Sequence, residues 1–177
     1  MTVPPVRFSI RDESPEDRAA VRAVHQAAFA GDAEVDLVAR LYADGDVLFG
    51  LVAAHRSIII GHIMFSRLPV ETPVGEVITA AALAPLAVLP ERQRQGIGSA
   101  LVRRGLDLCQ QREAPAVVVL GDPAYYGRFG FRAETARGLQ TPWSGPYLTA
   151  IVLRAAGEGI RSGIARYPAA FTALPMA

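Results

Sequence analysis

The sequence predicts a single α/β domain in which helices cover both faces of a mixed β-sheet. Short apolar segments of the kind found in strands alternate with longer segments of helical periodicity. The chain has 177 residues, a length that suits one domain with a sizeable core. Hydrophobic residues make up 51% and charged residues 20%, which is a globular composition rather than a disordered one.

The first part of the chain predicts a strand, two helices and a pair of strands. Residues 6–11 alternate apolar and polar side chains, as in a half-buried strand. A helix over 14–29 begins with Ser14 as its N-cap, and a second helix over 32–44 carries apolar side chains at helical spacing. The segment 47–68 then predicts two strands joined by a tight turn.

The second part of the chain predicts three strands and further helices. The expected elements are a strand over 77–89, a helix over 96–112, a strand over 116–121, a short helix or turn leading into a strand at Phe131, and a strand over 147–153. Pro85 lies inside the first of these strands and has no N–H to donate, so one side of that strand must be unpaired or bulged. Residues from 155 onward are expected to be irregular and to pack back on the domain.

Composition excludes several classes of chemistry. The net charge of +1 gives no broad basic field for nucleic acid. The chain contains no lysine and no asparagine, which excludes a lysine-dependent P-loop, a Schiff base and a Cys-His-Asn triad. One cysteine, Cys109, and three scattered histidines predict neither a disulfide nor a metal site. No segment has the length of a membrane span and no signal-peptide pattern is present, so we expect a cytoplasmic protein without a membrane partner.

Residues 86–102 carry the clearest functional signal. An apolar strand leads through a cluster of Arg and Gln side chains into two glycines and a helix. A helix N-terminus exposes unpaired N–H groups and partial positive charge, so it binds anions. Gly96 and Gly98 let the backbone approach a phosphate, and Arg94 and Ser99 add a charge and a hydroxyl. We therefore expect a bound phosphate-containing ligand here.

A dinucleotide site of the Rossmann type does not fit this turn. Leu101 occupies the position of the third glycine, and the turn lies in the middle of the chain. The region near Val118, where an acidic residue would be required, is entirely apolar.

Two motifs occur in a fixed order along the chain. Gln93-Arg94-Gln95-Gly96-Ile97-Gly98 matches the pattern Gln/Arg-x-x-Gly-x-Gly/Ala, and residues 126–131 match Tyr-x-x-x-Gly-Phe. Through these motifs and its element order, the chain resembles bacterial-type members of the GNAT acetyltransferase superfamily from about Val6 to Leu153. The resemblance implies the GNAT fold: a central, mostly antiparallel sheet with two splayed parallel strands and helices on both faces. It also implies one domain over residues 1–177, with a core at about 6–154 and an extension over 155–177.

The same resemblance implies how coenzyme A binds. The pyrophosphate would lie on the backbone N–H groups of residues 94–99, and the pantetheine arm would pair with the strand like an added strand. The implied binding residues are Leu86, Ala87, Val88, Gln93, Arg94, Gln95, Gly96, Ile97, Gly98 and Ser99. Pro85 agrees independently with a break in pairing beside that arm.

The activity implied is transfer of an acetyl group from acetyl-CoA to a primary amine by direct attack. Tyr126 is the implied proton donor for the leaving thiolate, with a packing role for Tyr125 and Tyr126 as the alternative. A base must supply the neutral amine, because an ammonium group is not nucleophilic. We expect Glu76 to be this base, with His62, Glu71 or a water relay as alternatives.

The acceptor is expected to be a small-molecule amine, because no acidic patch or basic stripe indicates a macromolecular partner. His25 and Phe29 are expected to line its pocket, with a surface position as the alternative for His25, and Trp143 either anchors a loop or closes one side. The apolar segment 163–174 is a candidate contact for a homodimer. Two rival functions are a non-catalytic acyl-CoA-binding sensor or scaffold, and a protein that binds an unrelated phosphate ligand.

Overall fold

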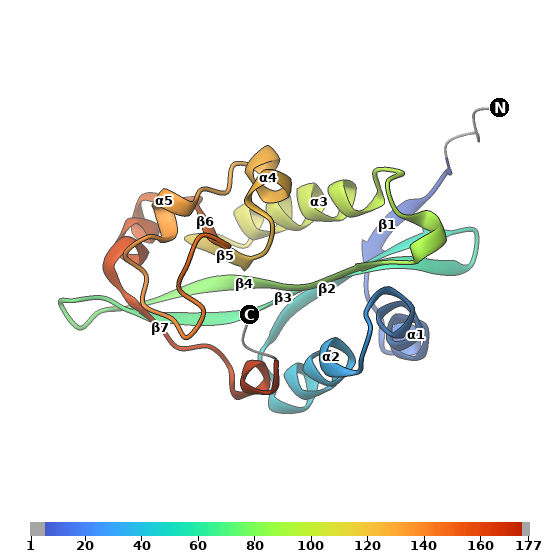
Figure 1. The fold of residues 1–177 in the computed structure, drawn as a ribbon, viewed down its shortest axis with the longest axis horizontal. Helices are drawn as coiled ribbons and strands as arrows, with labels where there is room; N and C mark the ends of the chain where they lie inside the picture. The colour runs from blue at the N-terminus through green and yellow to red at the C-terminus, as the bar shows by residue number, and fades with distance from the viewer. Residues whose placement is uncertain (1–5, 175–177) are drawn as a thin grey trace.

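The computed structural model describes residues 6–174 as one twisted sheet with helices on both faces (Figure 1). The strand order is β1-β2-β3-β4-β5-β6, and the short β7 pairs with β3. The strands are β1 (Ser9–Asp12), β2 (Val47–His55), β3 (Ile58–Glu71), β4 (Val77–Val88), β5 (Ala116–Leu120), β6 (Leu148–Val152) and β7 (Ile164–Ala165). The α-helices are α1 (Arg18–Ala28), α2 (Ala33–Asp44), α3 (Ile97–Gln111), α4 (Pro123–Tyr126) and α5 (Ala133–Ala136). This arrangement confirms the predicted mixed sheet with helices on both faces.

The sheet opens between β4 and β5. These two strands form the parallel pair, and every other strand pair described is antiparallel. Their pairing is confined to Ala81 opposite Val117 and Ala82 opposite Val118, although β4 continues to Val88. Pro85 lies where the register with β3 shifts, as the missing N–H of proline requires. The predicted break and splay are therefore confirmed.

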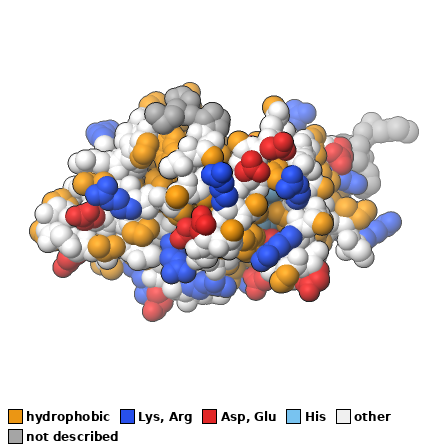
Figure 2. Space-filling view, turned by 90° about the horizontal axis from the view of Figure 1, so that it is seen from below, with side chains coloured by type: hydrophobic (Ala, Val, Ile, Leu, Met, Phe, Trp, Pro, Cys, Tyr) orange, Lys and Arg blue, Asp and Glu red, His pale blue; other side chains and the backbone are white. Residues whose placement is uncertain are grey.

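Two hydrophobic clusters lie on opposite faces of this sheet. Helices α1 and α2 cover one face together with the C-terminal segment, and α3 and α4 cover the other (Figure 1). Each amphipathic helix buries one stripe; α2, for example, buries Val35, Leu37, Val38 and Leu41. On the face of α1 and α2, acidic and basic side chains are interspersed (Figure 2), as the net charge of +1 leads one to expect.

The first predicted helix begins later than the sequence suggested. Residues Pro15–Asp17 form a 3₁₀ turn, and α1 starts at Arg18. The carboxylate of Asp17 accepts a hydrogen bond from the Ser14 backbone N–H at 2.8 Å and pairs with Arg11 at 2.6 Å. The hydrogen bonds from Arg11 hold the pKa of Asp17 well below its usual range.

The predicted strand at Phe131 was wrong. Only a single bridge, Arg132 to Ala150, extends the sheet there, because α5 begins at Ala133 and leaves no length for a strand. The C-terminal segment is also more regular than predicted, since β7 pairs with the end of β3 and the 3₁₀ helix Ala169–Ala173 packs beside α2. The implied domain and extension include residues 1–5 and 175–177, which lie outside the described residues.

Candidate active site

The turn before α3 has the geometry of an anion site. Gly96 has φ +83° and Arg94 has φ +58°, so the chain passes through two left-handed residues before the helix begins. Within residues 6–174, the backbone N–H groups of residues 94–99 donate to no backbone carbonyl. All of these residues except Gln95 line a cavity of about 560 Å³, whose wall includes most of the predicted coenzyme A residues. The N–H groups of this turn are therefore available to donate hydrogen bonds to an anionic ligand.

Several arginines and one tyrosine complete this cavity. Arg92, Arg94 and Arg128 line it, and the Arg128 guanidinium lies 4.5 Å from the centre of the Tyr125 ring. Arg128 also donates a long hydrogen bond of 3.4 Å to the Ser99 hydroxyl. Sequence reasoning missed Arg128 as a candidate, although it lies within the Tyr126–Phe131 motif and could have been found there.

Gly98 lies in close contact with the Tyr125 side chain. A Cβ atom at this position would lie 2.9 Å from the Tyr125 hydroxyl, closer than carbon and oxygen normally come. Tyr125 thus packs directly on the turn, whereas its neighbour Tyr126 faces a different cavity. The structure separates two tyrosines that the sequence could not distinguish.

The end of β4 presents free backbone groups to the gap in the sheet. Leu89 N–H donates to Ile60 O at 3.0 Å, and Ala87 O faces Gly61, so both residues turn their backbone toward β3. The backbone N–H and C=O groups of successive residues point to opposite sides of a strand. Those of Leu86 and Val88 therefore point toward the gap between β4 and β5. The Gln93 side chain already donates to Val88 O at 3.1 Å.

Two of the predicted coenzyme A residues do not face this cavity. Ala87 is buried with its backbone turned to β3, and the Gln95 side chain folds back to donate to Glu91 O at 3.1 Å. The others that were predicted do line the cavity. They are Leu86, Val88, Gln93, Arg94, Gly96, Ile97, Gly98 and Ser99.

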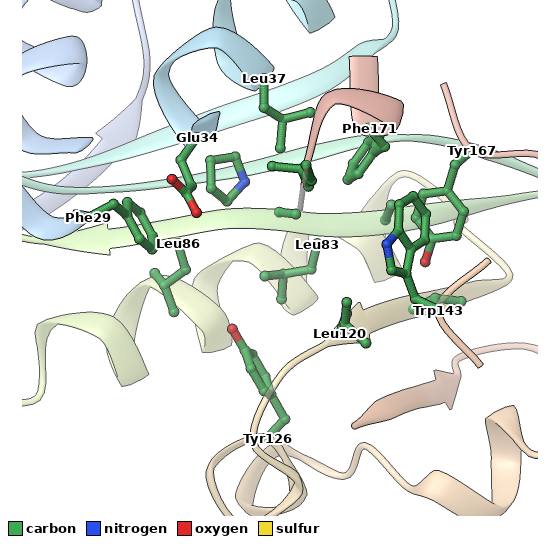
Figure 3. A pocket seen from close by; sticks show the side chains of 15 residues that line it. Phe29, Glu34, Leu37, Leu83, Leu86, Leu120, Tyr126, Trp143, Tyr167 and Phe171 are labelled. Atoms are coloured by element: carbon green, nitrogen blue, oxygen red, sulfur yellow. The ribbon is translucent and has the colours of Figure 1, made fainter. Parts of the chain in front are cut away.

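A second cavity of about 240 Å³ lies in the gap between β4 and β5 (Figure 3). Tyr126, which lines this cavity, belongs to the hydrophobic cluster under α3. Leu37 and Phe171 also line it and belong to the cluster under α1 and α2. The cavity therefore passes from one face of the sheet to the other. Leu86 lines both cavities, so the two lie next to each other at this residue.

Tyr126 points its hydroxyl into this second cavity (Figure 3). Its ring packs edge-on against Tyr125 and Phe131, with ring centroids 5.0 and 5.7 Å away. Within residues 6–174 no protein group is hydrogen-bonded to the hydroxyl, which leaves it free for a ligand. Burial raises the pKa of Tyr126, so the phenol keeps its proton at neutral pH, as a proton donor must.

Glu34 also points into the second cavity, from the first turn of α2 (Figure 3). Sequence reasoning missed this residue, because acidic side chains are common in the first turn of a helix and favour the helix dipole. No ion pair within the described residues holds its carboxylate. Phe29, predicted to line the acceptor pocket, lies beside it in the wall.

The structure does not bring the predicted bases to the site. Glu76 lies in the exposed turn between β3 and β4, a hairpin that projects away from the helices (Figure 1). Glu71 is exposed and pairs with Arg166 at 3.2 Å. Neither residue lines the cavity that contains Tyr126, so neither is placed to take a proton from a substrate there.

His25, predicted to line the acceptor pocket, is not among the residues that line the cavity containing Tyr126. His25 is fully buried behind Phe29, whose ring stacks on it with centroids 5.9 Å apart. Its Nε2 lies 2.8 Å from Nδ1 of His62, and His62 Nε2 lies 2.9 Å from the Glu13 carboxylate. Tyr42 donates to the same carboxylate. Burial, together with the nearby His62, lowers the pKa of His25 to about 3 and keeps it neutral.

Comparison with known proteins decides the family. The family model described as "Acetyltransferase (GNAT) family" matches residues 13–131, which include both motifs. The chain belongs to the GNAT acetyltransferase family. Within residues 6–174 of this GNAT protein, no helix is long and apolar enough to cross a membrane, and no cluster of three His, Cys, Asp or Glu side chains could hold a metal.

Relatives extend over nearly the whole chain. The GNAT protein is 37% identical over 161 residues to the uncharacterized N-acetyltransferase YhbS of Escherichia coli K12, covering 89% of this chain and 95% of YhbS. It is 38% identical over 135 residues to the uncharacterized N-acetyltransferase YjhQ of the same strain, covering 74% and 72%.

Two solved structures share the fold closely. The crystal structure of Escherichia coli YhbS in complex with CoA has a TM-score of 0.86 and 35% identity, covering 97% of this chain and 96% of that one. A GNAT acetyltransferase of Brucella melitensis in complex with acetyl-CoA has a TM-score of 0.78 and 32% identity, covering 94% and 99%. These likenesses confirm the predicted GNAT fold.

Proposed function

We propose that this GNAT protein transfers an acetyl group from acetyl-CoA to a primary amine of a small molecule by direct attack. The observation that carries the proposal is that two neighbouring cavities share Leu86 in their walls. One cavity has the free N–H groups and arginines suited to a pyrophosphate, and the other has a buried, protonated tyrosine. The complexes of the YhbS and Brucella melitensis proteins with CoA and acetyl-CoA support this assignment of the first cavity.

The residues of the gap suit each step of the transfer. The amine nitrogen attacks the thioester carbonyl, and the negative charge that develops on oxygen accepts hydrogen bonds from backbone N–H groups of β4 at Leu86 or Val88. The C–S bond then breaks, and Tyr126 donates its proton to the thiolate. The nitrogen gives up its extra proton to a base. Holding both reactants in one passage lowers the barrier by up to roughly 7–11 kcal/mol without a covalent enzyme intermediate.

Coenzyme A binding is tested by calorimetric titration with acetyl-CoA and with free CoA. Gly96→Glu should abolish binding because it fills the approach to the helix N-terminus. Gly75→Glu is the matched control, since Gly75 has the same φ of +83° but lies in the exposed hairpin turn with open space around it. Equal loss in both variants would indicate general damage, and absence of binding in the wild type would refute the proposal.

Turnover is tested by release of the CoA thiol with a panel of amines. Tyr126→Phe should lower kcat by about 10²–10⁴-fold, as expected for a lost general acid, while acetyl-CoA still binds. Tyr125→Phe should act on acetyl-CoA affinity rather than on kcat, because Tyr125 faces the other cavity. An unchanged kcat in Tyr126→Phe would show that Tyr126 is not the donor. Binding of acetyl-CoA without turnover of any amine would favour the non-catalytic sensor or scaffold.

A further inference from the structure

We infer that the acceptor is a monoamine on an apolar body about the size of an aromatic ring, and that Glu34 binds its ammonium group and accepts its proton. This inference rests on the proposed acetyl transfer and names the substrate class of the same site. It follows from three properties of the cavity in the gap: its charge, its aromatic end and the position of Glu34 relative to Tyr126.

The charge of the cavity wall favours one positive group on the acceptor. Among the described residues that line this cavity, Glu34 is the one charged side chain, and no arginine or histidine lies in the wall. An ammonium group therefore finds a partner. A carboxylate, a phosphate or a second ammonium group on the acceptor would lose its hydration without finding a partner of opposite charge. This loss is costly in free energy. Amino acids, phosphorylated amines and polyamines thus fit poorly.

The far end of the cavity is an aromatic wall. Trp143, Tyr167 and Phe171 pack edge to face, with centroids 4.9 Å apart for Trp143–Tyr167 and 5.0 Å apart for Tyr167–Phe171. They come from separate segments, so the loop before β6 and the C-terminal segment together form this surface. Aromatic walls of this kind prefer flat apolar groups, which gain both burial and favourable ring contacts.

The positions of Glu34 and of the aromatic wall indicate how an acceptor amine would lie in the cavity. In Figure 3, Glu34 and Phe29 stand at the end near Leu86, whereas Trp143 and Tyr167 stand at the opposite end. An amine held by Glu34 is thus placed near the junction where the thioester would arrive, and its apolar body extends toward the aromatic wall. Tyr126 approaches from the other side of β4 (Figure 3), so the carboxylate and the phenol need not exchange a proton with each other.

Glu34 is also placed to take the proton of the amine. With an ordinary amine pKa of about 10, only about one molecule in a thousand is neutral at pH 7, so removal of the proton limits attack. Glu34 first takes one proton from the ammonium group and passes it to solvent, which leaves a neutral amine with a free lone pair. As the new C–N bond forms, the second surplus proton passes from nitrogen to the Glu34 carboxylate. The thiolate receives its proton from Tyr126, and exchange with solvent then restores both residues. Glu34 is a catalytic residue in this scheme, since it contacts the reacting amine.

The first test compares acceptors that differ in one feature. We would measure kcat/KM for 2-phenylethylamine, phenylalanine, ethylamine and spermidine at saturating acetyl-CoA. Phenylalanine adds only a carboxylate to 2-phenylethylamine, and we expect at least a ~10²-fold lower kcat/KM for it, because the added charge is buried unpaired. Ethylamine lacks the ring and should be slower by about 10–100-fold. Spermidine should also be slower than 2-phenylethylamine.

The second test removes the carboxylate. Glu34→Gln should lower kcat/KM for 2-phenylethylamine by about 10²–10³-fold, while the acetyl-CoA dissociation constant stays within threefold. Asp36→Asn is the matched control, because it removes the same charge from the same helical turn at an exposed position outside the cavity. Glu34→Asp should recover part of the lost rate. Trp143→Ala should reduce the preference for 2-phenylethylamine over ethylamine by about tenfold.

The outcomes separate this inference from the proposed function. Faster acetylation of phenylalanine or spermidine than of 2-phenylethylamine would overturn the inference and leave acetyl transfer intact. Equal rates in Glu34→Gln and wild type would overturn the role of Glu34. Failure to acetylate any amine of the panel would overturn the acceptor class, and calorimetry with acetyl-CoA would then decide whether the proposed function fails with it.

Discussion

Replacing Gly121 with alanine should move the Tyr126 ring and slow turnover without weakening acetyl-CoA binding. A Cβ atom at position 121 would lie 2.5 Å from Cε2 and 3.0 Å from Cδ2 of Tyr126. Gly121 has no positive φ, so alanine is compatible with the backbone and the effect is steric alone. The ring cannot swing aside freely, because Tyr125 and Phe131 pack against it edge-on.

The size of the effect follows from these contacts. Carbon atoms in contact are about 3.5–4.0 Å apart, so the ring must retreat by about 1 Å. A misplacement of about 1 Å in a catalytic group can cost roughly 10²-fold in rate, or about 2.7 kcal/mol of barrier. Overpacking should also lower the free energy of unfolding, by about 1–3 kcal/mol.

The assay measures kcat by release of the CoA thiol and acetyl-CoA affinity by calorimetry, with thermal unfolding as a check of folding. Gly127→Ala is the matched control: it makes the same chemical change next to Tyr126, but the nearest atom to the new Cβ is Arg132 Nη1 at 3.7 Å. If Gly121→Ala keeps the wild-type kcat, the position of Tyr126 does not matter to turnover. An equal loss in both variants would indicate general damage.

Two further predictions concern the buried groups. The pKa of His25 is about 3 in the folded protein, whereas a histidine in the unfolded chain has a pKa of about 6.5. Below pH ~6.5 the unfolded chain binds a proton at His25 that the folded protein does not bind. The free energy of unfolding therefore falls as the pH drops from 6.5 toward 3. The free energy of unfolding from urea titration should drop by up to about 2 kcal/mol between pH 7 and 5 in wild type but not in His25→Gln, and a flat wild-type profile would contradict this. Burial raises the pKa of Cys109 to about 12, so iodoacetamide at pH 8 should label the unfolded chain but not the folded protein, and rapid labelling of the native state would refute that burial.

The turn before α3 and the break in β4 could be predicted from the sequence, because both depend on local rules. A glycine at a strand–helix turn allows a left-handed backbone conformation, and a proline within a strand removes a backbone hydrogen-bond donor. Both effects depend on the residue itself rather than on distant neighbours. Gly96 and Pro85 are therefore found where the sequence predicts them, at the left-handed turn and at the shift in register.

The cavity in the gap between β4 and β5 could not be predicted, because long-range packing creates it. Glu34 resembles any acid in the first turn of a helix until α2 is placed over the gap in the sheet. His25 and His62 are 37 residues apart, and only the packing of α1 on β3 brings them into contact. The expected strand at Phe131 was wrong for a related reason, since the bridge Arg132–Ala150 and the start of α5 depend on neighbours distant in sequence.

The gap between β4 and β5 would give bound coenzyme A a structural part to play. Beyond residues 81–82 and 117–118, no described backbone pairing joins these two strands, so this seam has the shortest pairing along the path from β1 to β6. The turn before α3 follows β4 in the chain, whereas Tyr125 and Arg128 follow β5. A ligand that contacts the turn and these two residues would therefore link β4 to β5. Its binding energy would then count as folding stability, about 2.7 kcal/mol at a hundred times the dissociation constant. Affinity for the acetyl donor and the mechanical integrity of the sheet would change together in any variant that alters this seam.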